Sequence, residues 1–255
     1  MQHRNPYRWW NIAAVIAVIA VNAMATLLPL NGKTTGELSD QYPVLITPAG
    51  YAFSIWSLIY LLLIGFAIYQ ARPRASRLPT VSQIGPWFLL SSLFNMAWIF
   101  AWHYEYVTAS VFIMLALLIT LIVLYTRVVT ATSKPTTGER FLVQLPFRIY
   151  LGWICVATIV NISVALYKAG WNGFGLSEVT WTIILLIFGT LLVFVMGTRY
   201  ADPYFMLVFV WAYVAIAYKQ QDYSAVSTTA LISAVLILIY AIGIALRKVR
   251  ALKLR

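Results

Sequence analysis

The chain has 255 residues, of which 62% are hydrophobic and only 10% are charged, and its formal net charge is +11. Soluble globular domains carry about a quarter charged residues, and a soluble core of this length could not bury so much apolar surface. The composition therefore excludes a soluble protein and predicts a polytopic membrane protein. Nucleic-acid binding, which a basic soluble protein would suggest, is not expected, because membrane topology explains the charge.

Eight apolar segments follow one another along the chain, each near the roughly 20 residues that cross a bilayer. The first follows a basic N-terminus, but it is longer than the apolar part of a signal peptide, so we expect a retained helix. The breaks HYEY (103–106) and RYADP (199–203) are short enough to require tight helical hairpins. The predicted segments span residues 9–30, 46–70, 84–103, 107–127, 141–168, 178–198, 203–219 and 225–246.

The basic residues support this count of eight. If the N-terminus lies inside and the segments alternate in direction, 15 of the 18 lysines and arginines, from Arg4 to Arg255, fall on the inner side. The exceptions are Lys33, Lys168 and Lys219. This asymmetry follows the positive-inside rule and predicts a multi-pass protein with both termini in the cytoplasm, for which a bacterial plasma membrane is expected. The lipid bilayer is its predicted partner, and the tail RKVRALKLR could contact anionic lipid.

No familiar constellation for catalysis or metal binding is present in the sequence. Cys155 is the single cysteine, and this topology places His3 and His103 on opposite faces, so we predict no disulfide and no metal site. No acidic residue falls clearly inside a segment, which argues against a proton-driven carrier. We predict no catalytic residues and no required cofactor, and an enzyme is not the favoured class.

Aromatic residues make up 15% of the chain. Tryptophans near predicted segment ends, such as Trp102, Trp171 and Trp181, fit the interfacial belt of membrane proteins. Others lie deeper, and Trp56 and Tyr60 share a helix face because they are four residues apart. The rise of 1.5 Å per residue places them in the same layers as the amide of Asn95. Helix packing and a small-molecule site both remain open, and spacing alone favours packing.

Three segments carry these residues in a recurring pattern: TPAGYAFSIWSLIY (47–60), FNMAW (94–98) and LPFRIYLGWICVATIVN (145–161). They resemble the second, third and fifth helices of the tryptophan-rich sensory protein / translocator protein (TspO/MBR) family. The positions in register are Pro48, Tyr51, Phe53, Trp56, Tyr60, Asn95, Trp98, Tyr150, Leu151, Trp153, Ala157 and Asn161.

The resemblance covers about residues 9–168 and implies a five-helix bundle with a ligand pocket. The predicted fold class is therefore an all-α polytopic membrane protein. It has a TspO-like five-helix bundle in residues 1–168 and a three-helix extension with a basic cytoplasmic tail in residues 169–255. Carried over from the family, the predicted ligand-binding residues are Tyr51, Trp56, Tyr60, Asn95, Trp98, Trp153, Ala157 and Asn161.

Similarity to this family implies a sensor or receptor for a tetrapyrrole, such as a porphyrin or haem-like molecule, or for another small, flat, apolar aromatic ligand. The alternatives are a passive transporter of that ligand, a porphyrin-degrading enzyme and a membrane scaffold that binds nothing. The chain departs from the family in the loop at residues 31–50, which has no tryptophan. A homodimer is also expected, since small residues such as Gly65, Gly189 and Gly243 allow close helix contacts.

Overall fold

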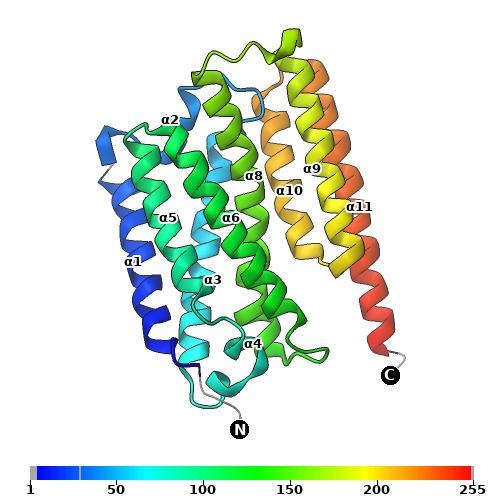
Figure 1. The fold of residues 1–255 in the computed structure, drawn as a ribbon. Coiled ribbons are helices and arrows are strands. Elements are labelled where there is room, and N and C mark those ends of the chain that lie inside the picture. The colour runs from blue at the N-terminus through cyan, green and yellow to red at the C-terminus, as the bar shows by residue number, and fades with distance from the viewer. Residues whose placement is uncertain (1–4, 29, 254–255) are drawn as a thin grey trace. The chain divides into compact units, whose positions relative to one another are not determined.

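The computed structural model describes residues 5–28 and 30–253, and the regular elements within these ranges are helical (Figure 1). The protein is thus an all-α polytopic membrane protein, as its composition predicts. The predictions on charge and metal binding also involve His3, Arg4 and Arg255. These three residues lie outside the described residues.

Each of the eight predicted apolar segments contains a long helix in the described chain. The segment predicted at 46–70 starts too early, because residues 46–49 are not helical and α3 begins only at Ile55, after η2. Six helical stretches are long and apolar enough to cross a membrane, and α10 is a shorter apolar helix. Helix α5 has 17 residues, about 25 Å of helix, which is less than the roughly 30 Å of hydrocarbon. The helices are α1 (Arg8–Leu27), α3 (Ile55–Ala71), α5 (Trp87–His103), α6 (Val107–Thr130), α8 (Leu145–Lys168), α9 (Glu178–Tyr200), α10 (Pro203–Lys219) and α11 (Ser224–Lys253).

Short helical elements connect the long ones. The five-residue π-helix η4 leads directly into α8 without a break in the helical path. These short elements are η1 (Leu30–Gly32), α2 (Thr35–Asp40), η2 (Gly50–Ser54), η3 (Ala75–Arg77), α4 (Pro79–Ser82), α7 (Thr137–Glu139), η4 (Arg140–Gln144) and η5 (Gly173–Gly175).

The two predicted tight hairpins are confirmed. Helix α5 ends at His103 and α6 begins at Val107, and Glu105 between them has a positive φ of 57°. Helix α9 is followed by Ala201, whose φ of 47° is in the left-handed region that reverses the chain. Asp202 then caps α10, because its carboxylate accepts hydrogen bonds from the first backbone amides after Pro203.

The chain folds into two compact units. Unit 1 contains the described residues of 1–39 and 54–154, and unit 2 contains those of 40–53 and 155–255. Helix α8 is continuous along the chain and passes from unit 1 to unit 2 after Ile154. The boundary at residue 168, which follows the family resemblance, stays a prediction.

Unit 1 is centred on three phenylalanines from three helices. Phe66 of α3, Phe88 of α5 and Phe147 of α8 meet edge to face, with ring centroids 5.2–5.9 Å apart, and all are buried. Helix α5 packs on both α1 and α6. Gln70 of α3 also donates a 2.7 Å hydrogen bond to the Arg8 carbonyl at the start of α1. Apolar packing and a few buried polar contacts therefore hold these helices together.

Unit 2 is built on α9, α10 and α11, which pack against one another and run side by side in Figure 1. The Tyr213 hydroxyl of α10 donates a 2.8 Å hydrogen bond to the Leu186 carbonyl of α9. This contact passes close to Gly189, where a side chain would collide with the hydroxyl. Gly189 thus serves packing within the chain, whereas a Cβ at Gly243 would meet nothing within 4 Å. The predicted homodimer stays a prediction.

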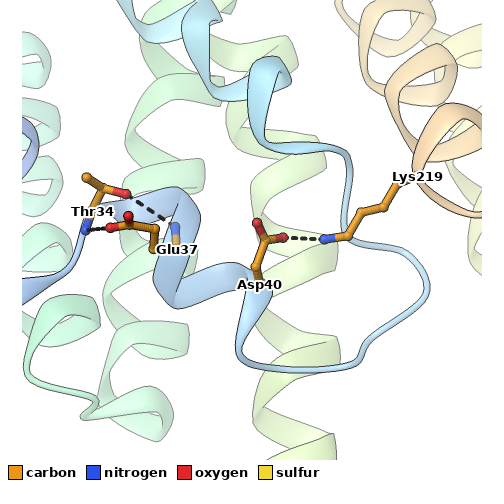
Figure 2. A network of polar contacts seen from close by, with 4 residues as sticks. All are labelled: Thr34, Glu37, Asp40 and Lys219. Atoms are coloured by element: carbon orange, nitrogen blue, oxygen red, sulfur yellow. Dashed lines mark hydrogen bonds and ion pairs between the residues drawn. The ribbon is translucent and has the colours of Figure 1, made fainter.

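Segment 40–53 also belongs to unit 2 and lies along α10. Lys219 forms an ion pair with Asp40 (Figure 2). Further along the segment, the amide of Ala49 donates to the carbonyl of Ala215 at 3.2 Å. The Trp211 indole donates a 3.0 Å hydrogen bond to the carbonyl of Ala52. The segment is therefore attached to α10 at three points.

Candidate functional site

Three of the predicted site residues of unit 1, Trp56, Tyr60 and Trp153, lie in a group of four rings. Trp56 stacks on Tyr60 one turn away, with centroids 5.6 Å apart and an interplanar angle of 16°, as their spacing on α3 predicts. Tyr150 and Trp153 of α8 contact Trp56 edge to face, at 5.8 and 6.5 Å. We call Trp56, Tyr60, Tyr150 and Trp153 the aromatic cluster.

A chain of buried amides supports this cluster. Asn22 of α1 donates a 2.8 Å hydrogen bond to Oδ1 of Asn95 on α5. Asn95 in turn donates through Nδ2 to the Tyr150 hydroxyl at 2.9 Å. Sequence reasoning identified Asn95 but missed Asn22. The same signal, an amide within an apolar segment, was available there, since such a group requires a partner in the membrane.

The cluster has a buried side and a more accessible side. Tyr150 and Trp153 are buried, whereas the rings of Trp56 and Tyr60 are half-buried. The Tyr60 hydroxyl is itself enclosed and has no hydrogen-bond partner among the described residues. A buried hydroxyl without a partner costs about 1–3 kcal/mol, so a ligand that accepts a hydrogen bond from it would recover that free energy.

Trp98, the third predicted tryptophan of unit 1, stacks on Trp102, with centroids 5.7 Å apart. Trp102 is buried rather than placed in the interfacial belt, and its indole donates to the Thr35 carbonyl at 3.4 Å. The expectation for Trp102 was therefore wrong. Its position near a helix end does not reveal the contact with Thr35, the first residue of α2.

His103, also near the end of α5, is buried and its ring nitrogens contact protein oxygens. Nε2 lies 3.0 Å from the Thr35 hydroxyl, and Nδ1 lies 3.1 Å from the Leu30 carbonyl. This geometry makes His103 a connector between α5 and the segment at residues 30–35. Among the described residues, no group of three or more His, Cys, Asp or Glu side chains could hold a metal ion.

The other three predicted site residues belong to unit 2. Tyr51 contacts two rings of α10, with centroids 5.3 Å from Trp211 and 6.0 Å from Tyr218. Asn161 of α8 is buried, and Ala157, one turn before it, is partly buried. The eight predicted residues are thus divided between the units, and their assembly into one pocket stays a prediction.

A cavity that the sequence did not indicate also lies in unit 2. Its volume is about 430 Å³, and its lining comes from residues 43–46, the second half of α8, residues 171–176 and α9. None of the eight predicted residues lines it. Trp171 and Trp181, which helix-end position assigned to the interfacial belt, form part of its wall.

Comparison with known proteins gives one family match. The sequence model of the TSPO-like protein family matches residues 8–243. The match therefore includes α9, α10 and most of α11, in addition to the helices that carry the aromatic cluster. No curated protein and no solved structure matches the chain significantly.

Proposed function

Because the chain belongs to the TSPO-like protein family, we propose that it is an integral membrane receptor that binds a flat, apolar ligand of the tetrapyrrole type at the aromatic cluster. The observation that carries this proposal is the nearly parallel stack of Trp56 on Tyr60, whose rings are half-buried. Such a stack offers a flat π-surface to a planar molecule. Each aromatic contact contributes about 0.5–1.5 kcal/mol beyond the area that it buries.

The surface is held in place before a ligand arrives. Trp56 is held by edge-to-face contacts with Tyr150 and Trp153, and Tyr150 is held by its hydrogen bond from Asn95. A binding surface that is already ordered avoids the entropy cost of immobilising side chains on binding. Asn95 uses its oxygen for Asn22 and its amide for Tyr150, so it positions the cluster and is not expected to contact the ligand.

The unpartnered hydroxyl of Tyr60 gives the site a polar contact. A phenol can donate one hydrogen bond and can also accept one, and a group that matches its donor is the propionate carboxylate of a porphyrin. One such bond contributes about 0.5–1.5 kcal/mol, which corresponds to a change in affinity of up to about tenfold.

Protoporphyrin IX binding to the purified protein in detergent tests the proposal. We expect saturable quenching of tryptophan fluorescence together with a shift of the porphyrin absorption band. Trp56→Phe and Trp153→Phe should weaken binding, and Tyr60→Phe should weaken it by up to about tenfold. Trp10→Phe is the control, because Trp10 is 67% exposed on α1. Equal, non-saturating quenching in every variant would mean that the porphyrin only partitions into micelles, and would refute the proposal.

The same preparations separate the alternative functions. If porphyrin flux into proteoliposomes exceeds that into empty vesicles, the protein is a passive transporter and not a receptor. If a new absorbing product forms under light and oxygen and is altered in Trp56→Phe, the protein is a degrading enzyme. Binding without flux or product supports the receptor.

A further inference from the structure

The cavity of unit 2 has the dimensions of a small-molecule site. Its volume of about 430 Å³ lies within the range of roughly 300–1,000 Å³ that is typical of ligand pockets. Apolar side chains, including Ile159, Leu185 and Phe188, supply most of its wall. The wall at residues 43–46 belongs to the segment that Lys219 and Trp211 attach to α10, so its position does not depend on a ligand.

Two tryptophans form an ordered aromatic side of this cavity. Trp171 and Trp181 lie with ring centroids 5.0 Å apart. The Trp181 indole donates a 2.8 Å hydrogen bond to the carbonyl of Gly173. Gly173 has a φ of +62°, and a Cβ there would lie only 3.1 Å from the indole nitrogen. The glycine therefore permits both the turn and the close approach that fix the Trp181 ring.

Most polar groups of the wall already have partners within the chain. The hydroxyl of Thr182 donates to the Glu178 carbonyl at 2.8 Å, and that of Ser163 donates to the Ile159 carbonyl at 2.9 Å. The side-chain oxygen of Asn172 accepts from the Phe174 amide. These groups stabilise their own helix or turn and offer little to a ligand.

Glu178 is different, because it is the charged residue of the described lining and its side chain is exposed at the start of α9. A carboxylate beside an apolar cavity favours a ligand with a positive charge at one end. Trp171 and Trp181, which line the same cavity, favour the same charge, since aromatic rings attract cations. The carboxylate also disfavours the phosphate of a lipid whose acyl chain would otherwise fill an apolar cavity.

We propose that this cavity is a second ligand site, which takes a small apolar aromatic amine with its ammonium group at Glu178. The site is independent of the aromatic cluster, because its lining lies entirely within unit 2 and shares no residue with the cluster. The protein then binds two chemically different ligands, a flat apolar molecule in unit 1 and an apolar cation in unit 2.

Two dansyl probes of similar length test this site. Dansylcadaverine ends in an ammonium group, and dansyl-6-aminohexanoate ends in a carboxylate. We expect saturable energy transfer from tryptophan to the ammonium probe and much weaker binding of the carboxylate probe. Glu178→Gln should weaken binding of the ammonium probe by up to about fivefold, as expected for an exposed ion pair, and should not weaken binding of the carboxylate probe. Leu185→Trp should fill the cavity and abolish binding.

Asp222→Asn is the matched control, because it removes an exposed carboxylate of unit 2 that does not line the cavity. Equal binding of the two probes, or binding unchanged in both Glu178→Gln and Leu185→Trp, would overturn the proposal. Displacement of the ammonium probe by dihexanoylphosphatidylcholine but not by excess unlabelled phenethylamine would assign the cavity to lipid and would also overturn it. Protoporphyrin IX binding in Glu178→Gln and Leu185→Trp reports separately on the aromatic cluster, so the two proposals can fail independently.

Discussion

Asn22 and Asn95 are 73 residues apart in the sequence, yet their side chains share a 2.8 Å hydrogen bond between α1 and α5. In membrane proteins, the two residues of a hydrogen bond between helices have a coupling energy of about 0.6 kcal/mol on average. A double-mutant cycle with Asn22→Ala and Asn95→Ala should therefore show a coupling of about that size in detergent unfolding measurements. Strictly additive losses of stability would show that the bond contributes nothing.

Phe66 lies between Phe88 and Phe147 at the centre of unit 1. Phe66→Ala leaves a cavity among buried rings and should lower the free energy of unfolding by about 3–5 kcal/mol. Thermal denaturation followed by circular dichroism measures this loss. Phe112→Ala, at an exposed position of α6, is the control and should change stability by less than about 0.5 kcal/mol. Similar losses in both variants would contradict the central role of Phe66.

Gly189 allows α10 to approach α9 at the Tyr213 hydroxyl. Gly189→Ala should destabilise the protein by about 1–3 kcal/mol, because the new methyl group displaces that hydroxyl. Adding Tyr213→Phe, which removes the obstructing oxygen, should recover part of the loss. Gly243→Ala has open space and should be neutral or stabilising, since alanine favours helices by up to about 1 kcal/mol. Equal loss of stability at both glycines would contradict the packing argument.

The ion pair of Lys219 with Asp40 and the hydrogen bond of Trp211 to Ala52 hold segment 40–53 on α10. Because Asp40 and Lys219 are partly exposed, Lys219→Ala should cost no more than about 1 kcal/mol. Trp211→Phe should lower the free energy of unfolding by a similar amount, because it removes the hydrogen bond to Ala52. It should also weaken the ring contact with Tyr51. Hydrogen exchange should rise across residues 40–53 in both variants. High salt, which screens the ion pair, should reproduce only the effect of Lys219→Ala. Unchanged exchange in both would show that other contacts hold the segment.

We expect the stability of the first turn of α2 to depend on pH, because the carboxylate of Glu37 forms a hydrogen bond there. This carboxylate accepts a 2.7 Å hydrogen bond from the amide of Thr34, while the Glu37 amide donates to the Thr34 hydroxyl (Figure 2). The Thr34 backbone amide, and after it the Thr34 side chain, stabilise the carboxylate and lower the pKa of Glu37 below its ordinary 4.5. A lowered pKa means that the stabilisation is present above pH 4.5 and is lost as the pH falls through the folded value.

Amide exchange at residues 34–38 should therefore increase below about pH 4.5, after correction for the intrinsic exchange rate. Glu37→Gln has no carboxylate to protonate and should remove this pH dependence. A variant that keeps the same pH profile would show that another group causes it.

Composition and local spacing were sufficient to predict the membrane class, the eight helical segments and the two tight hairpins. The stack of Trp56 on Tyr60 was also predictable, because residues four apart on a helix are neighbours whatever surrounds them. These features depend on interactions within one segment or with the bilayer, so they can be predicted from the sequence alone.

Only the tertiary structure decided which residues of different helices meet. Asn22 contacts Asn95 within unit 1, and Tyr51 contacts Trp211 within unit 2. The cavity likewise forms where residues 43–46 meet side chains of residues 159–188, which lie far away in the sequence. Helices that are apolar on most faces show no stripe to indicate their rotation. The partner of each face is therefore set by side-chain packing between helices, which a single sequence does not display.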